Sequence, residues 1–333
     1  MDGRDRGSSL PRLSDALSST TDATSKTAAL EEWNIFRSNC VCSPPTTTLS
    51  PATPAYISHN FHPKVGIGNL MFMYASLWGI AKKNGLRPTI KHTKLHDVFH
   101  LDLPPEDFFD LSDCNNLVLG IDEGCLYDNR TERISETAKG KNVSLWGYLQ
   151  SWRYFHPQYE GDIRRQFAFK EDIDSHADQI IQEFRSRSGD SSKKRPTVGI
   201  HIRRGDVMSN GWQKWGFTVA SREYVSHAME YLKSKGVVDP IYIVCTNDVE
   251  WSRQNLLGVD LHFVENQTSY VDMAVLTKMD HLILSVGTFS FFAGYLSSAP
   301  NVIYYKRWPE PGSDFAKWMD LSSFWLPEWI AME

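Results

Sequence analysis

The sequence has no apolar run long enough to cross a lipid bilayer. A membrane-spanning helix needs about 20 consecutive apolar residues. The best candidate, residues 282–296, is shorter and is broken by serine, threonine and glycine. Residues 1–30 are polar and have no apolar segment of the kind that a secretion signal requires. As written, the chain is expected to be soluble.

An excess of positive charge is also missing. The 35 Lys and Arg residues are outnumbered by 40 Asp and Glu residues, which gives a net charge of −5 and a pI of about 6.1. A surface that binds a polyanion needs clustered basic residues in excess. Nucleic acid is therefore not an expected partner, and any recognition of phosphate must be local.

Cysteine is scarce, and the odd count of five leaves at least one thiol unpaired. Cys114 and Cys125 bracket a short segment and could form a disulfide in an oxidising compartment, whereas Cys245 ends an apolar strand and is expected to be a buried thiol. N-x-S/T triplets, which are usable only in the secretory pathway, occur at three positions: Asn129, Asn142 and Asn266.

The remaining composition indicates a folded protein of one large domain or two smaller ones. Its 333 residues are 41% apolar and 12% aromatic. Residues 1–60 are rich in Ser, Thr, Asp and Pro and are predicted to be disordered, as a mucin-like stem or as a tail without function. Because residues 186–195 resemble a polar linker, we expect folded domains at 61–190 and 196–333.

Strands and helices alternate after residue 196. Strands are expected at 197–202, 240–245, 261–264, 281–285 and 301–305. Helices are expected at 221–235, 248–257, 269–279 and 290–297, with Ser221 and Ser269 as N-caps and Gly236 as a C-cap. This alternation predicts an α/β fold with a doubly wound parallel sheet.

An earlier segment predicts a glycine turn followed by an amphipathic helix. Leu70, Met73, Tyr74, Leu77 and Ile80 recur at helical spacing, and Gly85 suits the C-terminal cap. The preceding turn, residues 66–69, exposes backbone N–H groups that could hold an anion or sugar hydroxyls. A tight structural turn is the alternative interpretation.

The most informative stretch is Val198-Gly-Ile-His-Ile-Arg-Arg-Gly-Asp206. A strand of β-branched residues runs directly into Arg203 and Arg204 and then a Gly-Asp turn. Arginine grips phosphate in a fixed bidentate geometry. The carboxyl end of a strand in an open α/β sheet is where nucleotides bind. The pattern therefore predicts a local phosphate site.

Six segments in order resemble the α1,2-fucosyltransferases of glycosyltransferase family 11. They are Gly66-x-Gly68-Asn69-x-Met-Phe, Gly147-Tyr-x-Gln150-Ser-Trp152-x-Tyr-Phe, Val198 to Asp206, Asn247-Asp-x-Glu-Trp251, Asp272-Met-Ala-Val-Leu with Gly287-Thr288-Phe289-Ser290-Phe-Phe-Ala-Gly-Tyr-Leu, and Leu326-Pro-Glu-Trp329. The H-x-R-R-G-D pattern also resembles a motif shared by the α1,2-, α1,6- and protein O-fucosyltransferases, which use GDP-fucose. The resemblance covers residues 61–330.

The resemblance implies a GT-B-like fold of two Rossmann-like domains, with the donor on the carboxyl-terminal one. The implied reaction is inverting transfer of L-fucose from GDP-β-L-fucose to the 2-hydroxyl of a terminal galactose on a glycan. The implied donor-binding residues are His201, Arg203, Asp272, Thr288, Phe289 and Ser290. The implied acceptor cleft contains Gly66, Gly68, Asn69, Gln150 and Trp152. Arg203 and Arg204 would stabilise the diphosphate without a metal cofactor.

Two carboxylates carry alternative interpretations. Asp206 could be the catalytic base beside Arg203 and Arg204, or a carboxylate that caps the turn. Asp272 could accept the N1–H and 2-amino hydrogens of guanine, as a matching aspartate does in the similar α1,6-fucosyltransferases. Ser269-x-x-Asp272 is also a capping-box pattern. Asp172-Ile-Asp174 mimics a metal-binding D-x-D, but its charged surroundings favour a solvated helix surface.

The relatives are Golgi enzymes with an amino-terminal membrane anchor, so a lumenal Golgi location is expected, with an incomplete amino terminus or a truly soluble enzyme as alternatives. The sequence departs from the family pattern at Leu70, Val207 and Phe292. If position 70 or 207 contacts the acceptor, these departures weaken the inference about acceptor preference most. A fucosyltransferase with another acceptor and an inactive homologue that binds GDP or glycans remain alternative functions.

Overall fold

The structure, a computed structural model, describes residues 55–59, 61, 65–105, 116–120, 125–190, 192, 194–209, 211–258 and 260–333. The predicted disorder before residue 55 and the Cys114 half of the suggested disulfide lie outside these residues. Within them, no helix combines the length and the apolar character needed to cross a membrane. Tyr56–His59 lie within the segment 1–60 that was predicted to be disordered, but they form a strand.

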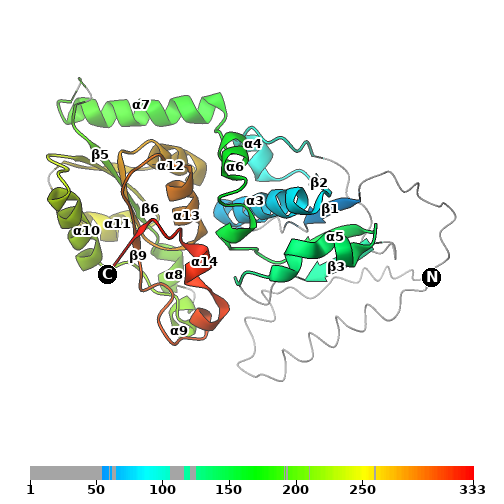
Figure 1. The fold of residues 1–333 in the computed structure, drawn as a ribbon. Helices are drawn as coiled ribbons and strands as arrows, with labels where there is room; N and C mark the ends of the chain where they lie inside the picture. The colour runs from blue at the N-terminus through cyan, green and yellow to red at the C-terminus, as the bar shows by residue number, and fades with distance from the viewer. Residues whose placement is uncertain are drawn as a thin grey trace, which may run out of the picture. The chain divides into compact units, whose positions relative to one another are not determined.

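The first sheet has four parallel strands in the order β2-β1-β4-β3 (Figure 1). The strands are β1 (Tyr56–His59), β2 (Arg87–Thr89), β3 (Asn116–Gly120) and β4 (Asn142–Trp146). Their companion helices are α3 (Ile67–Asn84), α4 (Lys94–Val98) and α5 (Ile134–Ala138). The sequence pattern did not resolve these strands, because runs of three to five residues are too short to show alternation.

The second sheet has six parallel strands in the order β10-β9-β8-β5-β6-β7. They are β5 (Thr197–Ile202), β6 (Ile241–Thr246), β7 (Leu261–Val264), β8 (His281–Leu284), β9 (Val302–Tyr305) and β10 (Ile330–Met332). The doubly wound parallel sheet predicted from the sequence is confirmed. Only β10 was not expected.

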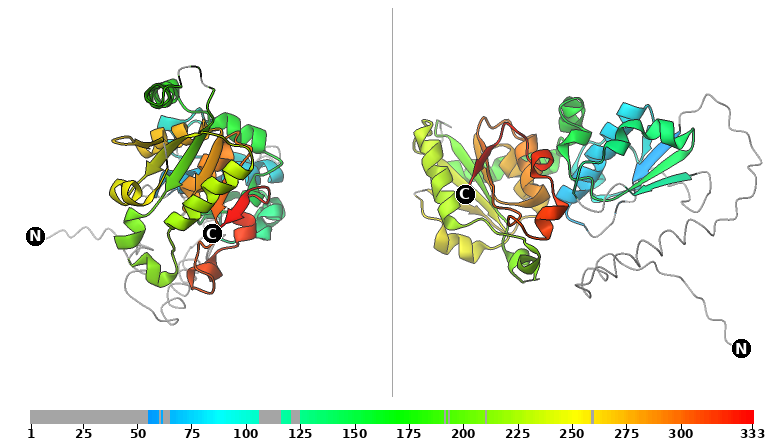
Figure 2. Two further views of the ribbon diagram at one scale, coloured as in Figure 1. Left: turned by 90° about the vertical axis from the view of Figure 1, so that its left-hand side faces the viewer. Right: turned by 60° about the horizontal axis from the view of Figure 1, so that its bottom comes forward.

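Helices cover both faces of this sheet. Figures 1 and 2 show α10 (Arg222–Ser234) and α11 (Val249–Asn255) on one face, and α12 (Ser269–Thr277) and α13 (Gly287–Leu296) on the other. The strand order reverses between β5 and β8, since β6 and β7 lie to one side and β9 and β10 to the other. The crevice at the carboxyl ends of β5 and β8 is where such sheets bind ligands.

The predicted helix caps are partly confirmed. Ser221 is the N-cap of α10, and its hydroxyl accepts a hydrogen bond from the Tyr224 N–H. The N-cap of α12 is Thr268 and not Ser269, because the helix takes in one more residue at its start. Helix α13 begins at Gly287, three residues before the predicted start at Ser290. Gly287 has a φ of +85°, which glycine alone adopts without strain.

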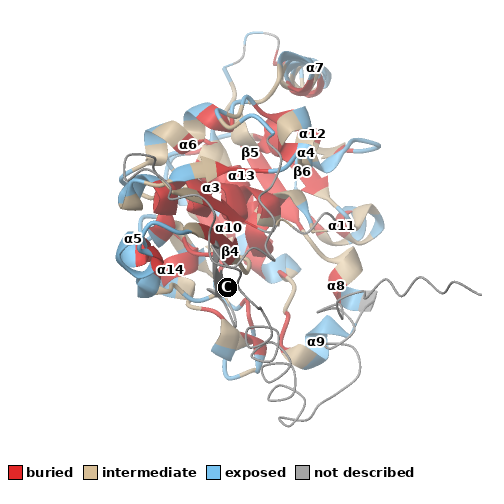
Figure 3. Ribbon diagram, turned by 90° about the vertical axis from the view of Figure 1, so that its right-hand side faces the viewer, coloured by how far each residue is buried: buried red, intermediate tan, exposed pale blue. Residues whose placement is uncertain are grey.

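The prediction that α3 is amphipathic is wrong. The helix is buried on all sides from Leu70 to Ala81 and appears red in Figure 3. Its second neighbour is α13, whose Phe291 and Phe292 ring centroids lie 4.6 and 4.9 Å from that of Phe72. A helix packed between a sheet and another helix needs apolar residues all round.

Two helices and a segment held by ion pairs and hydrogen bonds precede β5. Helix α6 spans Glu160–Gln166, and α7 spans Glu171–Arg187 and packs on α12. The segment expected as a linker at 186–195 is held by buried Asp190, whose carboxylate pairs with Arg185 at 2.5 Å and accepts from the backbone N–H of Lys194 and Arg195. This segment is therefore fixed to α7.

Gly68 permits the close approach of α3 to α13. A Cβ atom there would lie 2.6 Å from the backbone carbon of Thr288 and from the backbone nitrogen of Phe289. The backbone of α3 and the backbone of α13 cannot move apart at this point unless one of the two helices moves.

We predict that Gly68→Ala lowers the free energy of unfolding by about 1–3 kcal/mol, because overpacking forces the helices apart. Thermal unfolding measures this. Gly161→Ala, at an exposed position in α6 with no atom within 4 Å of the added Cβ, should be neutral or slightly stabilising. Equal melting temperatures for Gly68→Ala and wild type would contradict the packing described.

Candidate active site

The turn after β5 is held by Asn247, which follows β6. The Asn247 side-chain oxygen accepts from the backbone N–H groups of Arg204 and Gly205, at 2.8 and 3.1 Å. Its amide nitrogen donates to Asp206 at 2.8 Å. A Cβ on Gly205 would lie 2.9 Å from the Asn247 carbonyl oxygen, so glycine is required there. The turn that carries both arginines is thus fixed by the neighbouring strand.

Arg203 and Asp206 form a bidentate ion pair. Arg203 Nε and Nη2 donate to the two Asp206 carboxylate oxygens at 3.2 and 2.7 Å. The third nitrogen, Nη1, lies against Gly287 at the start of α13. Partial burial acts to raise the pKa of Asp206, but the hydrogen bonds and charge of Arg203 outweigh it, so the pKa is lowered. A carboxylate with a lowered pKa is a weak base, which favours the turn role of Asp206.

Arg204 is held by a different pair of residues from the helix α11 region. Its guanidinium carbon lies 4.3 Å from the Trp251 ring centroid, and its Nε is 3.6 Å from an Asp248 carboxylate oxygen. Stacking on an indole fixes the plane of a guanidinium while leaving its edge free to donate. Each arginine therefore has a carboxylate partner, and the turn carries no net charge from these four groups.

His201 lies in a small polar cluster beneath the turn. Its Nδ1 is hydrogen-bonded to the Ser290 hydroxyl at 2.7 Å, and its ring centroid is 4.6 Å from that of Phe289. Ser285, after β8, accepts from the Arg203 backbone N–H at 3.0 Å. Burial, with the nearby charge of Arg203, lowers the pKa of His201 to about 3. His201 is therefore a neutral imidazole that joins β5 to α13.

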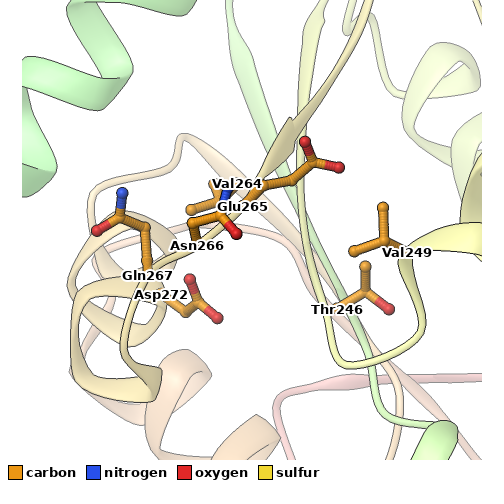
Figure 4. A pocket seen from close by; sticks show the side chains of 7 residues that line it. All are labelled: Thr246, Val249, Val264, Glu265, Asn266, Gln267 and Asp272. Carbon is orange, nitrogen blue, oxygen red and sulfur yellow. The ribbon is translucent and has the colours of Figure 1, made fainter.

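Asp272 lines a pocket at the carboxyl ends of β6 and β7 (Figure 4). The pocket has a volume of about 290 Å³, and its other lining residues are Thr246, Val249, Val264, Glu265, Asn266 and Gln267. Oδ1 of Asp272 is buried and has no hydrogen-bond partner among the described residues. Burial raises the pKa of Asp272 from 3.8 to about 7.

The capping-box interpretation of Asp272 finds no support in these contacts. The N-cap is Thr268, and its side chain makes no capping hydrogen bond. Ser269, the other half of the predicted box, is already inside the helix. A partly buried carboxyl that lines a pocket with one buried, unpartnered oxygen is costly for stability and typical of a binding site. His201 is not among the residues that line this pocket, so the structure separates these two predicted donor-binding residues.

A larger pocket, of about 820 Å³, lies at the opposite edge of the sheet, near the amino ends of β5 and β8. Its basic residues include Arg185, Arg195 and Lys278. Each of them is paired with carboxylates: Arg185 with Asp190, Arg195 with Asp239 and Asp260, and Lys278 with Asp174 and Asp178. Ligands of doubly wound sheets bind at the carboxyl edge, so this pocket is not the candidate site.

The predicted acceptor-cleft residues form a hydrogen-bonded junction with α13. The Asn69 side-chain oxygen accepts from Gln150 at 3.0 Å and from the Thr288 hydroxyl at 2.8 Å. Trp152 donates its indole N–H to the Trp325 carbonyl at 3.0 Å. Helix α3 begins beside this junction, with Gly66 as its N-cap and Gly68 pressed against α13. These contacts favour a structural turn over an anion-holding one at residues 66–69.

The model of one protein family, described as glycosyl transferase family 11, matches residues 57–333. The chain belongs to glycosyl transferase family 11. It is therefore a glycosyltransferase, as the six ordered motifs predicted.

Relatives of known name support this membership. A galactoside alpha-(1,2)-fucosyltransferase 1 of Leontocebus fuscicollis is 30% identical over 87% of this chain and 80% of its own. The human protein of the same name is 29% identical over 87% and 79%. The structure of an Arabidopsis thaliana FUT1 mutant in complex with GDP has a TM-score of 0.50 at 14% identity, over 83% of this chain and 77% of that chain. This likeness shows the GT-B-like fold.

Two departures of this family 11 chain from the family pattern lie in its core. Leu70 is 3% exposed and Val207 is 1% exposed. Neither side chain can therefore touch an acceptor glycan directly. Phe292, the third departure, packs among aromatic rings, including Phe155 and Phe167.

The predicted mimic of a metal motif lies in the first turn of α7. Asp174 pairs with Lys278 at 2.8 Å. Asp172 is two residues away, a spacing that does not bring side chains together on a helix. Among the described residues, no cluster of three or more His, Cys, Asp or Glu side chains has the arrangement of a metal site.

The sequence patterns assigned no site role to several residues that the structure places in or beside this candidate site. Ser285 and Asn247 each follow a strand of the sheet and hold the arginine turn. Asn266 and Gln267 follow β7 and line the pocket of Asp272. Their position in the sequence could have identified them, because polar residues that directly follow parallel strands meet at one edge of the sheet.

We predict that Asp272→Asn stabilises the protein at high pH. Because the folded-state pKa lies above the unfolded value, folding favours the protonated carboxyl. That contribution is complete below about pH 4 and is lost as pH rises through 7. The asparagine variant, which has no charge to bury, should melt at a higher temperature than wild type at pH 8, and the difference should shrink toward pH 4.5.

Thermal unfolding at the two pH values measures this difference. Glu230→Gln, which removes an exposed carboxylate on α10, should show little difference at either pH. A lower melting temperature for Asp272→Asn at both pH values would mean that the carboxylate stabilises α12 as a cap.

Proposed function

We propose that this chain transfers L-fucose from GDP-β-L-fucose to the 2-hydroxyl of a terminal galactose on a glycan, with inversion at the fucosyl carbon. The names of the family 11 relatives support the sugar, the linkage and the acceptor. The binding of the nucleotide part of the donor is supported by one observation on the second sheet. A turn with two fixed arginines and a pocket with an unpartnered carboxyl occupy the same edge of one doubly wound sheet.

The pocket of Asp272 suits guanine. A carboxylate can accept both the N1–H and the 2-amino hydrogens of guanine, a pair of donors that adenine and uracil do not offer. The carboxyl reaches its binding form only when it is ionised, and its raised pKa of about 7 reflects the missing partner. The side-chain amides of Asn266 and Gln267 line the same pocket and provide donors for the guanine carbonyl.

The turn after β5 and the start of α13 suit the diphosphate. Arg203 presents Nη1 beside Gly287, where the first backbone N–H groups of the ten-residue helix α13 are free of helical partners. Such a helix start favours an anion through its N–H groups and its dipole. Arg204, fixed on Trp251, adds a second guanidinium. Charge stabilisation of the departing GDP then comes from the protein, so no metal cofactor is required.

Asp206 then acts as a positioning residue for Arg203. Its two oxygens are committed to Arg203 and Asn247, which hold the guanidinium plane against α13. In this arrangement the segment 196–333 binds the donor, and the segment 61–190 contributes to the acceptor side of the site. Thr288, Phe289 and Ser290 contribute through the first turn of α13.

Release of GDP from GDP-fucose, with and without lactose, tests the function. Transfer to lactose, with linkage analysis showing a 2-linked fucose, is expected. A fucosyltransferase with another acceptor would transfer fucose to other glycans and not to lactose. A GDP-binding homologue without activity would bind GDP and release none, which would contradict the proposal.

We predict that Arg203→Lys lowers kcat by about 10²–10³, because removing one preformed donor to a developing anion has this effect. A lysine ammonium cannot keep both the Asp206 pair and a phosphate contact. The matched control is Arg222→Lys, at an exposed arginine on α10 paired with Glu223, which should retain wild-type kcat. Wild-type turnover by Arg203→Lys would exclude Arg203 from the diphosphate site.

A lumenal Golgi location belongs to the same proposal. Of the three N-x-S/T sites, Asn129 and Asn266 are exposed, whereas the Asn142 side chain accepts from the Tyr56 backbone N–H within the first sheet. Expression in a secretory cell should therefore add a glycan at Asn129 and none at Asn142, and the mass of the purified protein before and after enzymatic deglycosylation measures this. A protein with no glycan at Asn129 would contradict lumenal residence.

A further inference from the structure

An exposed apolar surface lies directly after the arginine turn. Helix α8 (Gly205–Ser209) begins directly after Arg204, and helix α9 spans Trp212–Trp215. Met208 is 43% exposed and Trp212 is 40% exposed. Of the tryptophans that the structure describes, Trp212 is exposed and the others are buried or half-buried. Apolar side chains that are exposed together beside the proposed diphosphate site mark a candidate contact surface for a ligand.

The other tryptophans near the site already have partners. Trp251 is covered by the Arg204 guanidinium. Trp152 donates its N–H to the Trp325 carbonyl and lies within the junction with α14 (Leu321–Phe324). Trp212 therefore offers the free aromatic face closest in sequence to the predicted diphosphate site.

A layer of aromatic rings holds Trp212 in place. Its ring centroid is 5.8 Å from that of Trp215 and 6.1 Å from that of Phe217. Phe217 stacks on Phe315 at 5.2 Å, with 13° between the ring planes. The Arg203 guanidinium carbon lies 5.5 Å from the Phe217 ring centroid. One continuous set of rings thus joins Arg203 to the exposed indole.

The backbone on either side of α9 restricts its movement. Gly216 has a φ of +111°, and a Cβ there would lie 2.1 Å from the Ser313 hydroxyl. Gly216 also accepts a hydrogen bond at its carbonyl from the Glu310 backbone N–H, at 2.8 Å. The Gln213 amide donates to the Met208 sulfur at 3.0 Å. Trp212 and Met208 are therefore held on a backbone whose movement is restricted, and most of α9 is coloured as exposed in Figure 3.

We propose that the exposed faces of Trp212 and Met208 bind the sugar ring of the acceptor. A pyranose has an apolar face of C–H groups and a rim of hydroxyls, which suits an indole face beside the polar edge of α9. A rigid aromatic side chain offers a large contact area at low conformational cost. The reacting hydroxyl must approach the fucosyl carbon next to the diphosphate, and α8 and α9 begin at that end of the turn. This inference rests on the proposed function.

Steady-state transfer to lactose, combined with calorimetry of GDP binding, tests the subsite. Trp212→Ala should raise KM for lactose about tenfold, which corresponds to the loss of one stacking contact of ~1.4 kcal/mol. The Kd for GDP and the slow release of GDP in the absence of acceptor should stay within about twofold of wild type. Trp212→Phe, which keeps a flat ring, should restore most of the acceptor affinity.

The matched control is Val238→Ala, which removes an apolar side chain that is 72% exposed after α10. It should change neither KM nor the Kd for GDP. An unchanged KM for lactose in Trp212→Ala would overturn the acceptor subsite, and so would a parallel loss of GDP affinity. A wild-type protein that never transfers fucose would instead contradict the proposed function, so the two failures are distinguishable.

Discussion

The close packing of α3 against α13 is the constraint on which the site depends. Gly68 allows the backbones of the two helices to come into contact, Phe72 packs against both Phe291 and Phe292, and the Asn69 side chain accepts a hydrogen bond from Thr288. The first turn of α13 is thereby fixed at the point where the strand order reverses. Both halves of the chain meet at the helix start that faces Arg203. A change in this packing would move the proposed phosphate site without touching a charged residue.

Electrostatic compensation differs between the two parts of the site. Arg203 and Arg204 each have a carboxylate partner, so the turn is stable without ligand and offers its remaining donors in a fixed direction. Asp272 has no such partner and is partly buried, which raises its pKa and weakens the fold around it. Under the proposed function, Asp272 gains its partner only when GDP binds. The proposal therefore separates the groups that hold the site together from the group that recognises the ligand.

The second half of the fold was predictable because its signals are strong and local. Strands β5 and β7 have the predicted bounds, and Ser221 caps α10 as expected. The first sheet was not predictable, since its strands are short. The sequence of α3 also does not reveal that α13 covers the outer face of this helix. The Arg203–Asp206 pair could be anticipated from spacing alone. The contacts by which Asn247 and Ser285 hold that turn could not be anticipated, because they depend on the register of three parallel strands.

The central claim is that the pocket of Asp272 binds the base while the turn of Arg203 binds the diphosphate. Calorimetric titration of wild type and Asp272→Asn with GDP and with pyrophosphate separates the two sites. The account predicts that the substitution weakens GDP binding by about tenfold or more, the loss of hydrogen bonds to a charged group, and leaves pyrophosphate binding unchanged. Equal GDP affinity in the two proteins, or an equal loss for both ligands, would contradict it.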